Sequence, residues 1–202
     1  MRGADLLAWL ASLPPDARDS AVDEHLGIGS PPPSAAEPPG DHLVGYHPSG
    51  VDPILQVCAQ VPLTPEDVVV DLGSGLGKVV LLAHLVTGAT ARGIEIQPSL
   101  VVRARASARR LGAEVAFTCA DVRDAALDDG TVFFLYAPFT GPVLAHVLRR
   151  LRVVAERRAI VVCALAIDLH REAPWLVARP LQTFWLTIYD SAAPGAGYRG
   201  GE

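Results

Sequence analysis

From residue 68 onward, short apolar runs alternate along the chain with segments whose apolar residues recur every three or four positions. Apolar runs bounded by turn residues are typical of buried strands, and the longer periodic segments are typical of amphipathic helices. Strands are expected at residues 68–72, 92–96, 115–119, 132–136 and 159–164, and helices at residues 78–87, 98–111 and 141–154. Such alternation with short connections predicts an α/β fold, a doubly wound, mostly parallel, Rossmann-like sheet with right-handed crossovers.

Two more apolar segments, near residues 176–179 and 183–189, follow the last of these strands. We expect them to form a hairpin around Pro180-Leu181-Gln182. The hairpin would bring the sheet to seven strands and add an antiparallel closing strand. Residues 191–202 are rich in glycine and are expected to be a flexible tail.

The N-terminal part of the chain follows a different pattern. Four of its apolar residues share a helical spacing: Leu6, Trp9, Leu10 and Leu13. They predict an amphipathic helix over residues 4–13 that ends at Pro14-Pro15. The stretch from Gly27 to Gly40 is dense in Pro, Gly, Ser and Ala, and is expected to be a linker or flexible loop without regular structure. Residues 1–44 are therefore expected to form a separate N-terminal region, and a short helix at 54–60 leads into the sheet.

The motif with the most chemical content is Asp71-Leu72-Gly73-Ser74-Gly75-Leu76-Gly77, which joins the first strand to the helix after it. Glycines let the backbone turn tightly and approach a ligand closely, and the helix N-terminus offers free N–H groups. The spacing is G-x-G-x-G and not the G-x-G-x-x-G of nicotinamide and flavin enzymes. Asp71 would repel a pyrophosphate, whereas it would stabilise a cationic amino-acid ligand. The loop therefore predicts a nucleotide-like ligand other than a dinucleotide.

Polar side chains also end the three strands that follow: Glu95, Asp121 and Tyr136. Because ligands of an open α/β sheet bind beyond the carboxyl ends of its strands, we expect these side chains to lie beside Asp71. Glu95 follows the glycine loop by about 20 residues, at the tip of the second strand, where an acid is placed to accept both hydroxyls of a ribose. An isolated Glu at a strand end would more often be merely solvated. The ribose-binding role of Glu95 is therefore inferred from its separation from the glycine loop and not from the residue alone.

In these features the chain resembles the class I S-adenosylmethionine-dependent methyltransferases. Asp71 to Gly77 match that family's first motif, and Glu95 matches its ribose-binding acid. Cys119-Ala120-Asp121-Val122 match the segment after its third strand, and Tyr136-Ala137-Pro138-Phe139 occupy the place of its fourth motif, beside the methyl group. The resemblance runs from Gly45 to Tyr189 and implies that residues 45–190 form an S-adenosylmethionine-binding methyltransferase domain.

The first motif is also similar, more narrowly, to that of the Dot1-like histone-lysine methyltransferases. This narrower resemblance extends from Asp71 to Leu81, with Tyr46 and Val51-Asp52-Pro53-Ile54-Leu55 upstream. It implies a protein lysine as the methyl acceptor.

The family resemblance implies S-adenosyl-L-methionine as the cofactor and a role for each matched residue. Asp71 would receive the cationic amino group, Glu95 the ribose hydroxyls, and Asp121 the exocyclic amine of adenine. The Val122 N–H would face a ring nitrogen. The loop residues Gly73, Ser74, Gly75 and Gly77 would let the backbone approach the ligand.

The candidates for the methyl-transfer site are Tyr136, Pro138, Phe139 and Tyr46. Pro138 and Phe139 are suited to line an apolar slot, and Tyr46 belongs to a segment that often folds over the cofactor in this family. Amino-methylating enzymes commonly have Asn or Asp where this chain has Tyr136, which weakens an assignment of N-methylation. A general base is optional for a reactive acceptor. The candidates for that role are His47, His84, His146 and His170.

Composition bears mainly on the partners. The 202 residues are enough for one α/β domain, and the net charge of −5 argues against a broad nucleic-acid surface, which needs an excess of Lys and Arg. Arginines clustered at 103–110 and 149–158 are expected to be solvated helix faces. The three cysteines have no C-x-x-C spacing and are expected to be buried free thiols in a reducing cytoplasm. Neither a metal site nor a membrane span is expected.

The sequence thus leaves the methyl acceptor open. A Dot1-like enzyme would methylate a protein lysine, whereas Tyr136 and the lack of a basic groove favour a small-molecule methyltransferase. A non-catalytic S-adenosylmethionine-binding module would keep the glycine loop without turnover. A nicotinamide oxidoreductase is disfavoured by the glycine spacing and by Asp71. The pattern indicates no particular oligomeric state.

Overall fold

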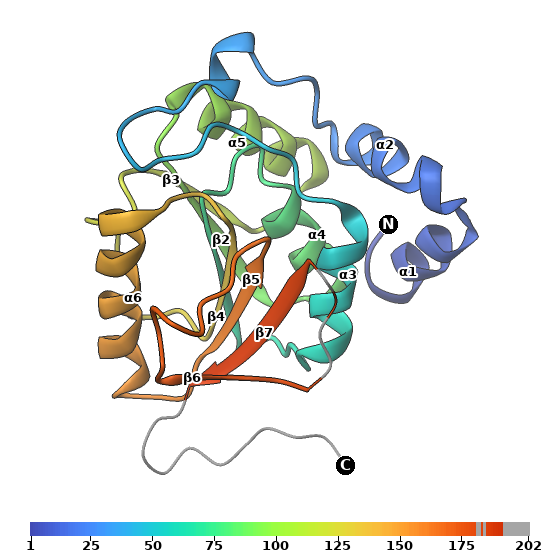
Figure 1. The fold of residues 1–202 in the computed structure, drawn as a ribbon. Coiled ribbons are helices and arrows are strands. Elements are labelled where there is room, and N and C mark those ends of the chain that lie inside the picture. Colours follow the sequence, from blue (N-terminus) through green and yellow to red (C-terminus); the bar gives the residue numbers. More distant parts are fainter. Residues whose placement is uncertain (181–182, 184, 192–202) are drawn as a thin grey trace.

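The computed structural model describes residues 1–180, 183 and 185–191. In these residues seven strands form one sheet in the order β3-β2-β1-β4-β5-β7-β6 (Figure 1). The strands are β1 (Val68–Leu72), β2 (Thr90–Glu95), β3 (Ala116–Cys119), β4 (Val132–Tyr136), β5 (Val161–Leu165), β6 (Leu176–Ala178) and β7 (Leu186–Ser191). Neighbouring strands are parallel except that β7 is antiparallel to both β5 and β6. The predicted doubly wound, mostly parallel sheet with an antiparallel closing strand is confirmed. Most of the expected turn at 180–182, and most of the predicted tail, lie outside the described residues.

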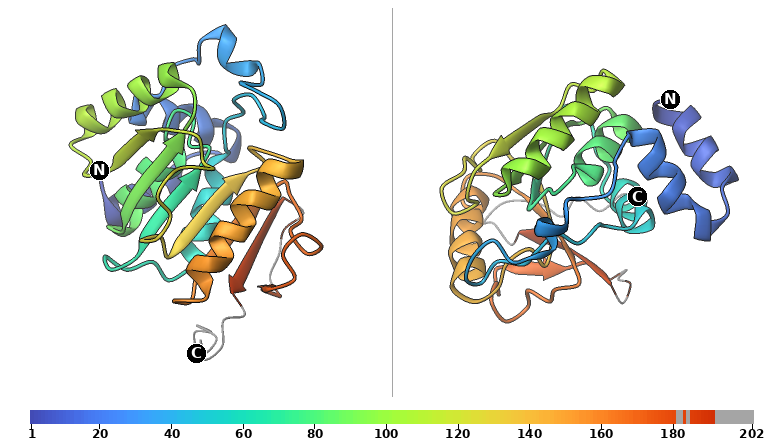
Figure 2. Two further views of the ribbon diagram at one scale, coloured as in Figure 1. Left: turned by 90° about the vertical axis from the view of Figure 1, so that its left-hand side faces the viewer. Right: turned by 90° about the horizontal axis from the view of Figure 1, so that it is seen from above.

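Helices cover both faces of the sheet (Figures 1 and 2). They are α1 (Gly3–Ser12), α2 (Pro15–Leu26), the 3-10 helix η1 (Pro33–Ala36), α3 (Val51–Gln60), α4 (Lys78–Thr87), α5 (Pro98–Leu111) and α6 (Gly141–Ala155). Alternate residues of β1 enter opposite cores: Val69 packs with residues of α3, α4 and α5, and Val70 packs with those of α6. The sheet is therefore buried on both sides, as expected for parallel strands joined by crossover helices.

The N-terminal region differs from its prediction in two respects. Residues 15–26 form the helix α2, whereas the sequence pattern predicts that helical structure ends at Pro14-Pro15. Pro15 is instead the first residue of a new helix, a position that tolerates proline because its missing N–H would have no partner there. The segment from Gly27 to Gly40 was expected to lack regular structure, but it contains η1. Ala35 of this helix is fully buried, and its carbonyl accepts the N–H of Tyr46 (2.7 Å) and the side-chain amide of Gln97 (3.2 Å).

Helices α1 and α2 contribute to the main core. Their buried residues belong to the same apolar cluster as α4: Leu6, Leu10, Val22 and Leu26. Truncating Leu10, which is 1% exposed, to alanine is expected to lower the free energy of unfolding by about 2–5 kcal/mol, because a buried cavity would remain. Leu7 is 44% exposed on the same helix, and Leu7→Ala is the matched control, with an effect of about 0.5 kcal/mol or less. Urea unfolding measures both, and equal effects would show that α1 does not pack as described.

The clustered arginines are exposed as expected, except for the half-buried Arg150, and several of them also bind main-chain carbonyls. The arginines concerned are Arg103, Arg105, Arg110, Arg150 and Arg158. On α5, Arg103 donates to Ser30 O (2.7 Å) and Arg110 to His25 O, which joins this helix to the N-terminal segment. The three cysteines are free thiols as expected, but Cys119 on β3 is exposed and not buried.

Candidate active site

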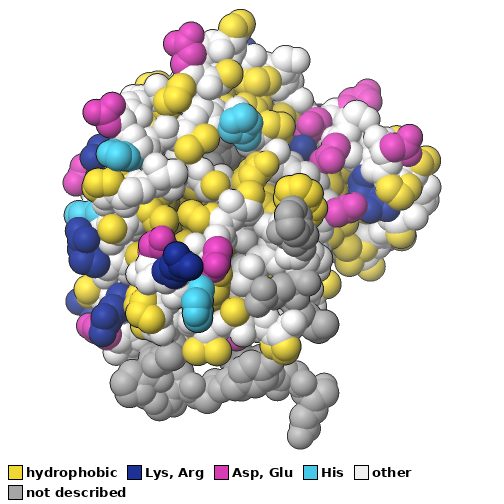
Figure 3. All heavy atoms as spheres, viewed as in Figure 1, with side chains coloured by type: hydrophobic (Ala, Val, Ile, Leu, Met, Phe, Trp, Pro, Cys, Tyr) yellow, Lys and Arg dark blue, Asp and Glu magenta, His cyan; other side chains and the backbone are white. Residues whose placement is uncertain are grey.

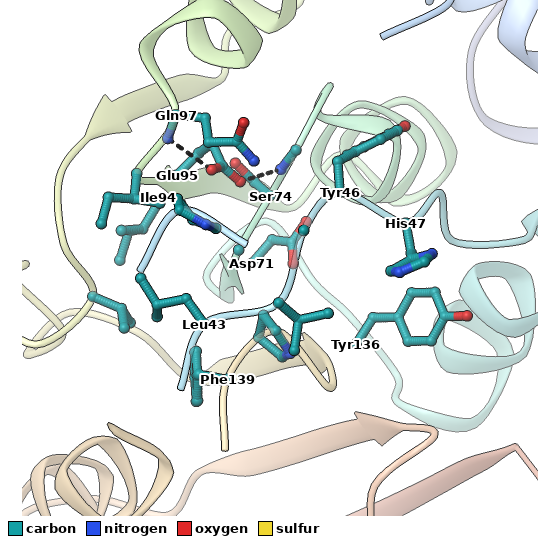
Figure 4. A pocket seen from close by; sticks show the side chains of 18 of the residues that line it. Leu43, Tyr46, His47, Asp71, Ser74, Ile94, Glu95, Gln97, Tyr136 and Phe139 are labelled. Carbon is teal, nitrogen blue, oxygen red and sulfur yellow. Dashed lines mark hydrogen bonds between the residues drawn. The ribbon is translucent and has the colours of Figure 1, made fainter. Parts of the chain in front are cut away.

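A cavity that opens to solvent lies at the carboxyl ends of β1, β2 and β4, and the empty space in and in front of it is about 850 Å³. Its other wall is the strap, which we define as residues 39–49 (Figure 4). Eleven of the twelve residues predicted from the sequence line it: Tyr46, Asp71, Gly73, Ser74, Gly75, Glu95, Asp121, Val122, Tyr136, Pro138 and Phe139. The strand order reverses between β1 and β4, which opens the crevice at this edge of the sheet.

The glycine loop makes close contact with two other parts of the site. Gly73 and Gly75 have φ values of 90° and 52°, a left-handed conformation that favours glycine. A Cβ on Gly73 would lie 2.6 Å from the Cβ of Pro138, and one on Gly75 would lie 2.5 Å from the Tyr46 ring. Neither position has room for a side chain. The loop therefore packs directly against the strap and against the segment after β4.

Two other loop residues differ in their role. Gly77 is the one predicted site residue that does not line the cavity. A Cβ there would lie 2.5 Å from the ring of Phe117, so Gly77 allows α4 to begin close to β3. Ser74 does line the cavity, and its buried Oγ has no hydrogen-bond partner within the described residues. A buried hydroxyl without a partner is costly, which makes Ser74 a candidate to bind a ligand.

Glu95 is held rigidly at the end of β2. Its Oε2 accepts the N–H of Gly75 (2.8 Å), and its Oε1 accepts the N–H of Gln97 (2.8 Å) (Figure 4). The side chain is 7% exposed. Each carboxylate oxygen has a second lone pair, so Glu95 can still accept two donors, such as a pair of neighbouring hydroxyls.

Asp71 is the penultimate residue of β1, and its carboxyl group is directed into the cavity (Figure 4). Burial raises the pKa of Asp71 to about 8, and the charge of Glu95 contributes to the increase. The carboxyl group is therefore mostly protonated at neutral pH. A cation bound beside it would favour the ionised form, so this end of the cavity is suited to a positively charged group.

Asp121 follows β3 and is paired with an arginine that sequence reasoning missed. Its Oδ1 accepts the main-chain N–H (2.8 Å) and the Nε–H (2.9 Å) of Arg123, and its Oδ2 also binds the guanidinium. The side-chain hydrogen bond from Arg123 is the main reason why the pKa of Asp121 is lowered. An Arg two residues after the acid is the sequence signal that could have indicated this pair. Val122 is buried in the core beside it.

The strap is joined to the segment after β4 by its main chain. Three contacts connect them: Val44 N–H to Pro138 O (3.0 Å), Thr140 N–H to His42 O (2.9 Å), and an antiparallel bridge between Leu43 and Phe139. Ala137 has a φ of 37°, which is strained for a residue other than glycine and above all before proline. These contacts hold the strained turn in place. Leu43 and Val44 also line the cavity, and no motif in the sequence indicates this.

Aromatic and imidazole rings line the part of the cavity next to the strap and the end of β4. Tyr46 and His47 come from the strap, and the ring of His47 lies beside that of Tyr136 (Figure 4). Burial raises the pKa of Tyr46 to about 12, with further contributions from Asp23 and Glu95, so its hydroxyl stays protonated. Of the four histidines considered as bases, His47 alone lines this cavity.

Two further observations limit the chemistry. Within the described ranges, no group of three or more His, Cys, Asp or Glu side chains is arranged to hold a metal ion. In the same residues no helix combines the length and the apolar character that crossing a membrane requires.

Comparison with known proteins agrees with this geometry. A family model described as a methyltransferase domain matches residues 69–162. An RNA methyltransferase from Salinibacter ruber, solved with S-adenosyl-L-homocysteine, is 27% identical, with a TM-score of 0.59 and coverage of 76% of this chain and 98% of that one. A putative RNA methyltransferase from Pyrococcus horikoshii is 17% identical, with a TM-score of 0.56 and coverage of 86% and 96%. Mitomycin 7-O-methyltransferase is 15% identical, with a TM-score of 0.55 and coverage of 69% and 52%. No curated protein matches the sequence significantly.

The residues present fit the cofactor that these comparisons indicate. The cavity offers a fixed carboxylate for hydroxyl groups, a buried acid for a cation, and a glycine loop without room for side chains. The comparisons do not support the narrower Dot1-like resemblance. The sheet, the cavity and the matched domain lead to one conclusion: the chain is an S-adenosylmethionine-dependent methyltransferase with the class I fold.

Proposed function

We propose that this methyltransferase acts on a small molecule that reaches the methyl group between His47 and Tyr136. The observation that carries the proposal is the lining of the cavity at this end, where aromatic and imidazole rings stand in place of the acid or amide typical of amino-methylating enzymes. Flat side chains with a polar tip suit a planar or apolar acceptor. They offer no carboxylate to a charged lysine side chain, so a protein lysine is the less favoured acceptor.

The cofactor would be held by the residues assigned to it from the sequence. When bound, S-adenosylmethionine supplies a methyl group made electrophilic by its sulfonium. In the proposal Glu95 accepts the ribose hydroxyls with its remaining lone pairs, and Asp71 binds the amino group. Asp121 accepts the adenine amine while sharing its oxygens with Arg123, and the Val122 N–H faces the ring. Pro138 and Phe139 form the apolar floor of the methyl-transfer site.

RNA is the second candidate, because the 27% identical methyltransferase is described as acting on RNA. An RNA-binding face needs cations that can neutralise phosphates. Here the net charge is −5, and the guanidinium of Arg105 binds Phe117 O (3.0 Å) while that of Arg150 binds Ala125 O (2.6 Å). The charge and these contacts favour the small molecule.

The acceptor class can be tested directly. The enzyme would be incubated with methyl-labelled S-adenosylmethionine and a cell lysate fractionated into protein, RNA and small molecules. We expect label in the small-molecule fraction together with release of S-adenosylhomocysteine. Label in RNA or protein would overturn the proposed acceptor, and binding without product in every fraction would indicate a non-catalytic module.

His47 is proposed to accept the acceptor's proton as the methyl group is transferred. His47→Gln is expected to lower kcat by about 100-fold or more with unchanged cofactor affinity, because general bases contribute about 10²–10⁴-fold. Release of S-adenosylhomocysteine in the active lysate fraction measures the rate. His170→Gln removes an exposed imidazole outside the cavity and serves as the control. Full turnover in the His47 variant would show that the acceptor needs no base.

A cytoplasmic location remains a prediction from the free thiols. The presence of active enzyme in a cytosolic fraction of the source cells would test it.

A further inference from the structure

We propose that Lys78 binds the carboxylate of the cofactor's amino-acid part, and that helix α2 positions Lys78 for this task through Asp19 and Asp23. The inference rests on the proposed cofactor site and assigns one more contact within it. It also gives the N-terminal helices a part in cofactor binding.

The placement of Lys78 is costly in two ways. It is the single lysine of the sequence, it is 6% exposed, and it is the first residue of α4, directly after the glycine loop. A cation at a helix N-terminus opposes the helix dipole. A buried ammonium is also destabilising unless its charge is compensated. Such a position is more readily explained by a ligand than by stability.

The compensation comes from a helix far away in the sequence. The Nζ of Lys78 lies 2.8 Å from Asp23 Oδ1 and 3.4 Å from Asp19 Oδ1, both on α2. Asp19 also accepts the N–H of Val51 (2.9 Å), which fixes it to the start of α3. An ammonium group has three donors, so two acidic partners leave one for a group inside the cavity that Lys78 lines.

The charges in the cavity indicate which group that is. Among its lining residues, Lys78 is the only Lys or Arg, whereas Asp71, Glu95 and Asp121 are acidic. The amino-acid part of S-adenosylmethionine carries one amino group and one carboxylate. Asp71 begins the glycine loop and Lys78 follows it, so the two ends of the loop offer a carboxyl group and an ammonium group to the two ends of a zwitterion.

Helix α2 supplies both acidic partners of Lys78. It lies outside residues 69–162, which the methyltransferase domain model matches. Acidic side chains gather on the part of the surface formed by the N-terminal helices (Figure 3). The sequence of α2 contains four acidic residues: Asp16, Asp19, Asp23 and Glu24. Two of these four contact Lys78, which provides controls on the same helix.

The test compares two ligands that differ in the amino-acid part. S-adenosylhomocysteine contains the carboxylate, and 5′-methylthioadenosine lacks the whole amino-acid part. Calorimetry with Lys78→Gln is expected to show affinity for S-adenosylhomocysteine reduced by about 10- to 100-fold, as for a lost charge-assisted hydrogen bond, with unchanged affinity for 5′-methylthioadenosine. Lys78→Arg should restore part of the loss, because it keeps the charge.

The role of α2 is tested by Asp23→Asn, with Glu24→Gln as the matched control. Asp23→Asn is expected to lower, several-fold, the affinity for S-adenosylhomocysteine relative to that for 5′-methylthioadenosine. Glu24→Gln is expected to leave this ratio of affinities unchanged. A ratio unchanged in Lys78→Gln would overturn the carboxylate assignment, and one unchanged in Asp23→Asn alone would overturn the role of α2. If the wild-type protein bound neither ligand, the proposed cofactor site itself would be wrong.

Discussion

Replacing Glu95 by glutamine is expected to weaken S-adenosylmethionine binding by about 100-fold, the combined effect of losing two charge-assisted hydrogen bonds of moderate strength. In the free protein both carboxylate oxygens already accept a main-chain N–H, one from Gly75 and one from Gln97. A glutamine side chain has one acceptor oxygen, so its amide group would have to face one of these donors. The substitution thus disturbs the glycine loop and also removes an acceptor for the ribose.

Calorimetric titration with S-adenosylmethionine measures this effect. Glu114→Gln makes the same chemical change at an exposed position outside the cavity, and its affinity should equal that of the wild type. Near-normal binding in Glu95→Gln would mean that the carboxylate serves only to shape the loop. Loss of binding in both variants would point to a general effect of charge.

Asp71→Asn is expected to have opposite effects on stability and on binding. Burial raises the pKa of Asp71 in the folded state to about 8, above its ordinary value of 3.8. The folded protein therefore holds this proton more tightly than the unfolded chain does. The protonated Asp71 contributes its full stabilisation of the fold below pH 3.8, the ordinary pKa that it has in the unfolded chain. The free energy of unfolding then falls as the pH rises toward 8, by at most about 1.4 kcal/mol per pH unit. Asparagine has no proton to lose, so the variant should become progressively more stable than the wild type from pH 5 to pH 8.

Binding should respond in the other direction. A cationic amino group beside Asp71 favours the carboxylate, so binding to the wild type is expected to release a proton and to strengthen between pH 6 and pH 8. Asp71→Asn should bind about 10- to 100-fold more weakly at pH 8, with no proton released from this position. Calorimetry in two buffers of different ionisation enthalpy measures the proton, and thermal unfolding across the same pH range measures stability.

Asp5→Asn, an exposed substitution on α1, is the control for both measurements. It should change neither the pH dependence of stability nor the release of the proton. Tight, pH-independent binding by Asp71→Asn would refute the assignment of Asp71 to the amino group.

The sheet could be predicted because most of its parallel strands are short apolar runs that alternate with helical segments. Val68, Val69 and Val70 lead directly to Asp71, and Glu95 ends the next strand about 20 residues later, so both the fold and one edge of the cavity follow from local pattern and spacing. Helix α2 could not be found in this way. Its sequence is largely polar, and its contribution to the core depends on Val22 and Leu26 alone. The proline pair before it resembles a stop signal, although Pro15 begins the helix.

The contacts between segments far apart in the chain could not be predicted from the sequence pattern either. Arg123 turning back to Asp121 is a local effect and could have been noticed. The pairing of Lys78 with Asp19 and Asp23 depends on how α2 packs, and nothing near Lys78 in the sequence indicates it. The position of the strap was equally hard to predict. His47 lines the cavity because main-chain contacts join its segment to the one after β4, and these contacts have no sequence signal.

The close packing of Gly75 beneath the ring of Tyr46 has a consequence for the divergence of this protein. The aromatic ring occupies the space that a side chain at position 75 would need, so the two positions are a matched pair. We expect homologous chains with a larger residue at position 75 to have a smaller one at position 46. Cofactor loop and strap should therefore evolve together, although the sequence separates them by a whole helix and a strand.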